Sequence, residues 1–196
     1  MCPLASEEKK ALLDIARKAI ALAVTERRQL EVATPHGALA AGAGAFVTLH
    51  KGQRLRGCIG RLFAADPLAN VVAQCAVGAA TEDPRFSPLR ADELGELGIE
   101  ISVLSEVHGA RPEQVEAGTH GLVISRNGHR GVLLPQVARE HHWSRERFLE
   151  ETCRKAGLSP DAWKEPETQL EIFTAETFSE ADFQGARPRG AGAAEK

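Results

Sequence analysis

The sequence Arg56-Gly57-Cys58-Ile59-Gly60 contains the residue types that thiol chemistry requires. Alternate residues of a β-strand face the same side, so Arg56 and Cys58 share one face, while Gly57 faces the core. A permanent cation beside a cysteine favours the thiolate, which is a nucleophile and a soft ligand. Gly57 and Gly60 leave room for a substrate or another backbone. The alternative is a small, buried and inert cysteine, which composition alone favours.

A second cluster of chemically capable residues lies between two prolines. Asp83, Arg85 and Phe86 occur in the sequence Asp83-Pro84-Arg85-Phe86-Ser87-Pro88, whose prolines restrict the backbone. Arg85 can pair with Asp83, or it can present its two parallel N–H groups to a carboxylate or a phosphate. The sequence leaves both alternatives open.

Two further clusters carry groups that can move protons. His120 and Gly121 end the sequence Gly118-Thr119-His120-Gly121. A histidine in such a loop more often hydrogen-bonds the loop than acts as a base. Further along, Gln136 and Glu140 are four residues apart in a predicted helix and therefore share one of its faces.

Composition excludes several classes of protein. The net charge is −3 and the sequence pI is about 6.2, so no overall basic field attracts nucleic acid. The four cysteines form no CxxC pair and the histidines have no partners at ligand spacing, so we expect neither a metal nor a cofactor. The sequence contains no apolar run that could span a membrane and no signal peptide, and we expect a cytoplasmic protein.

The elements that must position these residues follow one another twice. A helix is predicted from Ser6, as its capping residue, to about Arg28. A hairpin over 45–59, a helix from about 66 to 80 and a strand over 99–104 come next. A second hairpin over 121–134 precedes helices at 135–141 and 144–156, the latter capped by Ser144, and a strand over 170–176.

This order predicts an internal repeat, with units at about 44–107 and 119–178. Neither unit can bury both of its faces alone. We therefore expect an α+β fold in which two hairpin–helix–strand repeats form a mostly antiparallel sheet system flanked by helices, as two closely packed subdomains. One domain would cover 1–183, and the Gly-, Ala- and Pro-rich tail, 184–196, would be disordered.

Four motifs, taken in order, resemble the AMMECR domain family, whose prokaryotic members are called protein A of the AmmeMemoRadiSam system. The motifs are Leu55–Gly60, Asp83–Leu89, Gly118–Gly121 and Leu134–Glu140 with Trp143. The resemblance spans about Ser6 to Ser179. It implies two α+β subdomains with the cysteine motif near a cleft, and it implies a Memo-type protein and a radical-SAM enzyme as partners. Gln136 departs from a glutamate in the eukaryotic version of the motif, so we assign it no acid–base role.

Three functions follow as hypotheses. In the first, an enzyme or enzyme subunit acts through Cys58 on an anionic small molecule or modified macromolecule. Its catalytic residues would be Cys58, Arg56, His120 and Glu140, and its substrate-binding residues would be Gly57, Gly60, Asp83, Arg85, Phe86 and Gly121.

In the second hypothesis, the chain is a non-catalytic adaptor or substrate-binding protein in which Cys58 only packs. The third hypothesis, RNA binding, has less support because the chain contains no tyrosine and few phenylalanines for base stacking. It would depend on a patch formed by Arg54, Arg56, Arg61, Arg85, Arg126 and Arg130.

Overall fold

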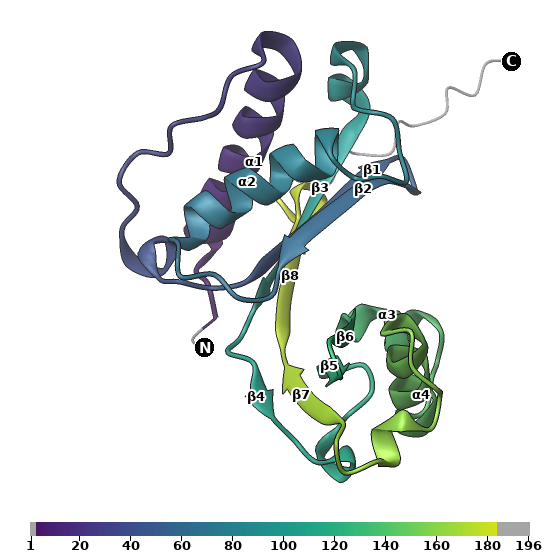
Figure 1. Ribbon diagram of the computed structural model, residues 1–196. Helices are drawn as coiled ribbons and strands as arrows, with labels where there is room; N and C mark the ends of the chain where they lie inside the picture. The colour runs from purple at the N-terminus through teal and green to yellow at the C-terminus, as the bar shows by residue number, and fades with distance from the viewer. Residues whose placement is uncertain (1–2, 184–196) are drawn as a thin grey trace, which may run out of the picture.

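The computed structural model describes residues 3–183 and contains two halves, each built on a four-stranded antiparallel sheet (Figure 1). The expected α+β fold is therefore confirmed. The helices are α1 (Ser6–Glu26), α2 (Leu68–Thr81), α3 (Pro135–Glu140) and α4 (Arg145–Lys155). The strands are β1 (Ala45–Lys51), β2 (Arg54–Arg61), β3 (Leu97–Leu104), β4 (His108–Gly109), β5 (Gly121–Arg126), β6 (His129–Leu133), β7 (Gln169–Phe173) and β8 (Ala175–Ser179). Short 3-10 turns lie between them at Gly37–Ala40, Ala91–Glu96, Pro112–Gln114, Ala162–Lys164 and Glu180–Asp182.

The first sheet has the strand order β2-β1-β3-β8, and α1 and α2 cover one of its faces (Figure 1). Leu12, Ala16 and Ile20 recur at helical spacing along α1 and are fully buried. Every second residue of β1, from Ala45 through Leu49, is buried against the helices. The intervening residues of β1 are only partly buried, because they face the opposite side of the sheet.

The second sheet has the order β4-β7-β5-β6, with α4 packed on one face. Ser144 caps α4, as expected, by accepting a hydrogen bond from the Arg147 N–H at 3.2 Å. The β5–β6 hairpin turns at Asn127 and Gly128, which both have positive φ, as expected for an Asn-Gly turn.

The two halves share the order in which their strands pair. Strands β2-β1-β3 of the first sheet correspond to β6-β5-β7 of the second, each with a helix after the hairpin. Gly57 of β2 lies against the backbone of α2, and Gly131 of β6 likewise lies close to the backbone of α4. These correspondences support the internal repeat, which stays a prediction.

Three boundaries differ from those predicted. The single strand expected over 170–176 is two strands, because the chain leaves the second sheet at Thr174 and joins the first as β8. Both parts alternate in hydrophobicity, so periodicity alone could not reveal the change of sheet. Ala5, not Ser6, occupies the cap position of α1, and α1 ends at Glu26. The predicted disordered tail, 184–196, lies outside the described residues.

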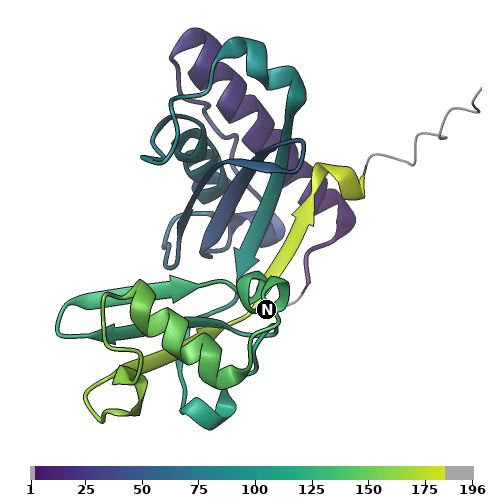
Figure 2. The same cartoon turned by 90° about the vertical axis from the view of Figure 1, so that its right-hand side faces the viewer.

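The halves meet around a small apolar cluster formed by Leu104, Val123 and Phe173. The chain crosses between the halves after β3 and again at Thr174 (Figure 2). Among residues 3–183, no helix is both long and apolar enough to cross a membrane.

Candidate functional site

The face of the first sheet that α1 and α2 leave uncovered carries a row of polar side chains. Thr48 of β1 pairs with Cys58 of β2 on one side and with Glu100 of β3 on the other, and Glu100 pairs with Ser179 of β8. Adjacent strands are about 4.8 Å apart, so the backbones at Cys58 and Glu100 are separated by about 10 Å. We call this row, together with His50, the polar face.

Glu100 has the most unusual environment on the polar face. Its partial burial raises the pKa of its carboxyl group, and the charges of Glu140 and Asp182 raise it further, while His50 lowers it. A cavity of about 480 Å³ is lined by His50, Glu100 and Ser179, among others. A carboxylic acid whose pKa is raised beside a cavity can carry a proton to or from a bound molecule.

Cys58 is partly buried, and desolvation raises the pKa of its thiol. The Thr48 hydroxyl lies 3.4 Å from Cys58 Sγ as a hydrogen-bond donor, and this contact, like the charge of Arg85, lowers the pKa. Asp83 and Glu100 raise it. Since burial is the largest effect, the resting group is a neutral thiol, which is a weaker nucleophile than a thiolate.

Asp83 binds the outer edge of β2 at Cys58. Its side chain is 2% exposed, and its Oδ2 accepts the Cys58 N–H at 2.8 Å. Arg85 donates to both carboxylate oxygens, from Nε at 2.9 Å and from Nη2 at 2.7 Å. These hydrogen bonds hold the pKa of Asp83 well below its usual range. Of the two alternatives for Arg85, the structure shows pairing with Asp83, and its guanidinium group lies over the Phe86 ring.

Arg56 does not act on the Cys58 thiol, which corrects the effect expected from strand parity. Its guanidinium group donates to Glu93 from Nε at 2.9 Å and from Nη2 at 3.0 Å, and it also donates to the Ser87 carbonyl. The register of β1 and β2 shifts next to Arg56, between Leu49 and His50. Alternation does not continue through such an irregularity.

The glycines of the cysteine motif allow close packing. A Cβ on Gly57 would lie 2.1 Å from the Ala79 carbonyl oxygen of α2, and one on Gly60 would lie 2.2 Å from the Phe46 ring. Of the two uses predicted for Gly57, the approach of another backbone is the one that the structure shows. The motif therefore fixes how β2 lies on α2.

Gln136 of helix α3, in the second half, contacts the first sheet beside the polar face. Its Nε2 donates to Ser102 Oγ at 3.0 Å and to Thr177 Oγ1 at 2.6 Å. Glu140, one turn later, acts electrostatically on Glu100 across the junction. The predicted shared face of Gln136 and Glu140 thus points to the first sheet.

His120 and Gly121 belong to the second half, where His120 precedes β5 and Gly121 is its first residue. His120 Nδ1 accepts the Glu116 N–H at 3.1 Å, which is the loop contact that the sequence favoured. Gly121 allows close packing of Phe173, whose ring would lie 2.3 Å from a Cβ at this position. No hydrogen bond within residues 3–183 joins His120 to Cys58.

The polar face was only partly foreseen. The motif led to Cys58, and the helix pattern led to Glu140. His50, Thr48 and Glu100 were not predicted as site residues. The signal for Glu100 was present, since Ile99-Glu100-Ile101-Ser102 places an acid and a hydroxyl on the side of a strand opposite to its buried residues.

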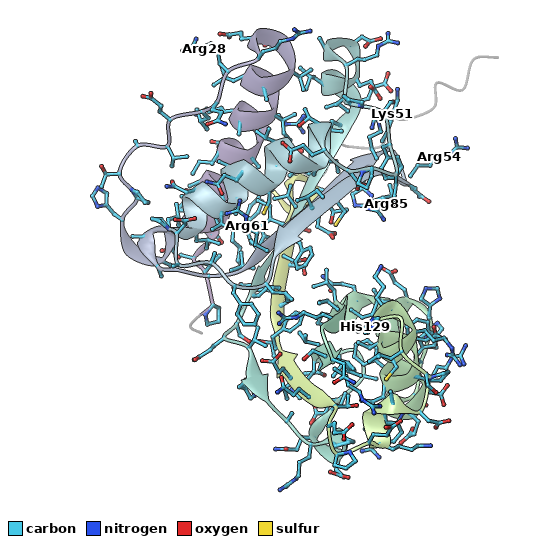
Figure 3. The ribbon with its side chains drawn as sticks, viewed as in Figure 1. Arg28, Lys51, Arg54, Arg61, Arg85 and His129 are labelled. Carbon is cyan, nitrogen blue, oxygen red and sulfur yellow. The ribbon has the colours of Figure 1, made fainter. Side chains whose placement is uncertain are left out.

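Two other kinds of site have little support in the part of the chain that the structure describes. Of the arginines that could form a basic patch, all but Arg54 have a carboxylate partner, at Glu93, Asp66, Asp83, Glu165, Glu167 or Glu171. Figure 3 shows Arg54 extending outward from the β1–β2 end of the molecule. Residues 3–183 also contain no group of three or more histidine, cysteine, aspartate or glutamate side chains that could hold a metal ion.

Known proteins resemble the chain over most of its length. The AMMECR1 family model matches residues 13–178. A protein of Methanopyrus kandleri is 40% identical over 192 residues, covering 93% of each chain. A protein of Methanothermobacter thermautotrophicus is 39% identical over 186 residues, covering 91% of this chain and 97% of the relative. The crystal structure of an uncharacterized protein from Pyrococcus horikoshii has a TM-score of 0.78 and 37% identity, covering 86% of this chain and 89% of that one.

Proposed function

The chain belongs to the AMMECR1 family, and from that premise we propose that it is an enzyme subunit that binds a small molecule on the polar face and moves protons there. The observation that carries this proposal is the carboxyl group of Glu100, which has a raised pKa beside a cavity of about 480 Å³. Thr48 lies between Glu100 and Cys58 in the sheet, pairs with both residues, and donates a hydrogen bond to the Cys58 thiol. Glu100 would be the general acid or base, and the neutral Cys58 thiol would donate a hydrogen bond or a proton.

The charge of the polar face favours a neutral or cationic group on the substrate. Glu100, Glu140 and Asp182 contribute negative charge, and Arg56 and Arg85 already have carboxylate partners. The anionic substrate expected from the sequence stays a hypothesis that this face supports less well. A Memo-type protein and a radical-SAM enzyme remain the partners suggested by the family resemblance, and they would supply or consume the small molecule.

Metabolite profiling tests the proposal. The purified chain, alone and with the two suggested partner proteins, is incubated with a cell extract, and mass spectrometry follows the compounds that disappear or form. We expect turnover that Glu100→Gln abolishes and that Cys58→Ala reduces about 10²-fold or more. The matched control is Glu106→Gln, an exposed glutamate outside the polar face. Turnover that persists in Glu100→Gln would refute the assigned role.

A non-catalytic adaptor is the second candidate, and one observation favours it. Arg56, Asp83 and Arg85 are engaged in contacts within the chain, and Gly57 packs on α2, so much of the motif has a structural task. In that case Cys58→Ala and Glu100→Gln would leave both complex formation and partner turnover unchanged.

A further inference from the structure

We propose that a groove on the helical side of the first half binds an extended peptide through its main chain. The groove has a volume of about 590 Å³. It lies between α1, α2 and part of a segment that we call the strap, residues 29–35, which follows α1. Figure 1 shows this segment arching away from the end of α1 and descending to the 3-10 turn at Gly37–Ala40. The groove shares no lining residue with the cavity beside Glu100, so it is a separate site.

Asn70 on α2 lines the groove and has an unused hydrogen-bond acceptor. Its Oδ1 is buried, and it accepts no hydrogen bond within the part of the chain described here. Most buried polar side-chain atoms in proteins have a hydrogen-bond partner. An acceptor without one suggests that a bound molecule supplies the donor. A turn of the Asn70 side-chain amide towards the groove would let an N–H group of a bound ligand supply that donor.

Gln74 provides a second amide one helical turn after Asn70, also in the groove lining. The Cβ atoms of residues four apart on a helix are about 5–6 Å apart. Alternate residues of an extended chain are about 6.6–6.8 Å apart, which is a similar spacing. A primary amide has both N–H donors and a carbonyl acceptor, and it therefore complements a peptide group. Asn70 and Gln74 can thus bind successive peptide groups that face α2.

The strap offers free backbone groups on the other side of the groove. Residues 29–35 are all described, and no hydrogen bond joins their backbone to another group of residues 3–183. Free N–H and C=O groups along a segment can pair with an added extended chain. An extended peptide would therefore receive hydrogen bonds from both sides, from the strap and from the amides of α2.

The remaining lining specifies the side chains of the peptide. Ala73 and Val77 contribute an apolar surface for a small or medium apolar side chain. Arg61 also lines the groove, and its ion pair with Asp66 is long, at 3.7 Å, so its guanidinium group can bind a further carboxylate. Figure 3 places Arg61 beside α2. Glu31 and Glu82 also line the groove and can attract a basic group. The expected ligand is therefore an extended peptide with an apolar residue, an acidic residue or a C-terminus near Arg61, and a basic residue near Glu31 or Glu82.

Peptide selection on the full chain tests this inference. A phage-displayed library of short random peptides is selected against the immobilised protein, and the enriched peptides are synthesised for fluorescence polarisation. We expect Asn70→Ala and Gln74→Ala each to weaken binding about tenfold, since each removes hydrogen bonds to the main chain. Gln53→Ala, at an exposed position of the β1–β2 turn, is the control and should leave the Kd unchanged. N-methylation of one peptide N–H should also weaken binding about tenfold, and bound peptide should slow hydrogen exchange at strap amides.

The inference would be overturned if no peptide is enriched over the support alone, or if Asn70→Ala, Gln74→Ala and the unaltered protein bind equally. Competition by single amino acids at the same Kd would also overturn it, since a small zwitterion would then be the ligand. Gln74 is exposed, so Gln74→Ala keeps the test valid if Asn70→Ala does not fold. Glu100→Gln should leave peptide binding unchanged, which separates this result from the test of the polar face.

Discussion

Replacing Asp83 by Asn should destabilise the protein far more than a charge-neutralising change of a single side chain usually does. The Asp83 side chain is 2% exposed, and its two oxygens accept hydrogen bonds from the Cys58 N–H, the Arg85 N–H and the Arg85 guanidinium group. An asparagine keeps one oxygen and turns an NH₂ group towards donors. It therefore loses about half of these hydrogen bonds and creates a donor–donor contact at the edge of β2.

The magnitude follows from the contacts. A hydrogen bond to a charged group contributes about 1.5–3 kcal/mol, and cutting one partner from a buried ion pair costs about 3–5 kcal/mol. The Arg85 side chain is 56% exposed, so water can solvate its freed guanidinium group and reduce the loss. We expect Asp83→Asn to lower the free energy of unfolding by about 3 kcal/mol. For a chain of this size, that lowers the Tm by roughly 6–12 °C.

The pH dependence gives the same prediction a second test. The folded-state pKa of Asp83 lies below the unfolded value of about 3.9, so its contribution is fully present above about pH 4 and is lost as the pH falls towards the folded-state value. The stability difference between the protein and Asp83→Asn should therefore be constant from about pH 7 to about pH 5. It should shrink only at more acidic pH.

Urea unfolding monitored by circular dichroism, at a series of pH values, measures both quantities. The matched control is Asp92→Asn, which removes an Asp–Arg pair with the same separation of two residues but with side chains that are 63% and 75% exposed. It should change the stability by about 0.5 kcal/mol or less. An Asp83→Asn effect as small as that of the control, or one that does not depend on pH below about 4, would refute the reasoning.

Four further outcomes follow from the same contacts. Gly57→Ala should lower the free energy of unfolding by about 3 kcal/mol or more in urea titrations, since the added Cβ would lie 2.1 Å from a backbone oxygen. Gly95→Ala is the control and should have little effect, because a Cβ at this position meets nothing within 4 Å. Alkylation of Cys58 by iodoacetamide, resolved by peptide mass spectrometry, should be slower than that of a free thiol near neutral pH, and a faster rate would contradict the raised pKa. Glu100→Gln should raise the free energy of unfolding by up to about 1 kcal/mol near neutral pH. A carboxyl group whose pKa is raised in the folded state destabilises the fold as the pH rises and the group ionises, and glutamine removes this effect. Thermal melts that show a lower Tm for Glu100→Gln would contradict this. Glu93→Gln should lower the free energy of unfolding above about pH 4 and have no effect at very acidic pH, since Arg56 lowers the pKa of Glu93 to about 2. Unfolding of both proteins at a series of acidic pH values measures this difference in stability.

Sequence periodicity could predict the elements because each one buries a regular stripe or an alternating face. The helix that became α2 and the hairpin at Asn127-Gly128 follow from apolar spacing and from turn chemistry, which are local properties. The change of sheet at Thr174 could not be predicted in this way. Both sheets bury alternate residues, and the choice of partner strand is a long-range property.

The candidate site shows the same limit. The motif around Cys58 predicted the position of the site, but strand parity misplaced the Arg56 guanidinium group, because a register shift between two strands cannot be read from the sequence. The importance of Glu100 depends on which residues surround it. His50, Glu140 and Asp182 come from three distant segments, and only the folded chain brings them to one carboxyl group.

The passage of the chain from β7 to β8 has a consequence for biosynthesis. The first sheet takes its last strand from residues 175–179, whose partners in β3 are made about seventy residues earlier. Until the ribosome has released this segment, the β3 edge from Glu100 to Leu104 has no neighbour on one side. Unpaired strand edges invite association with other chains, so the nascent protein is exposed to misassembly until residues 175–179 have emerged and paired with β3. A nascent chain that has emerged only as far as Phe173 can therefore close its second sheet while its first sheet still lacks β8.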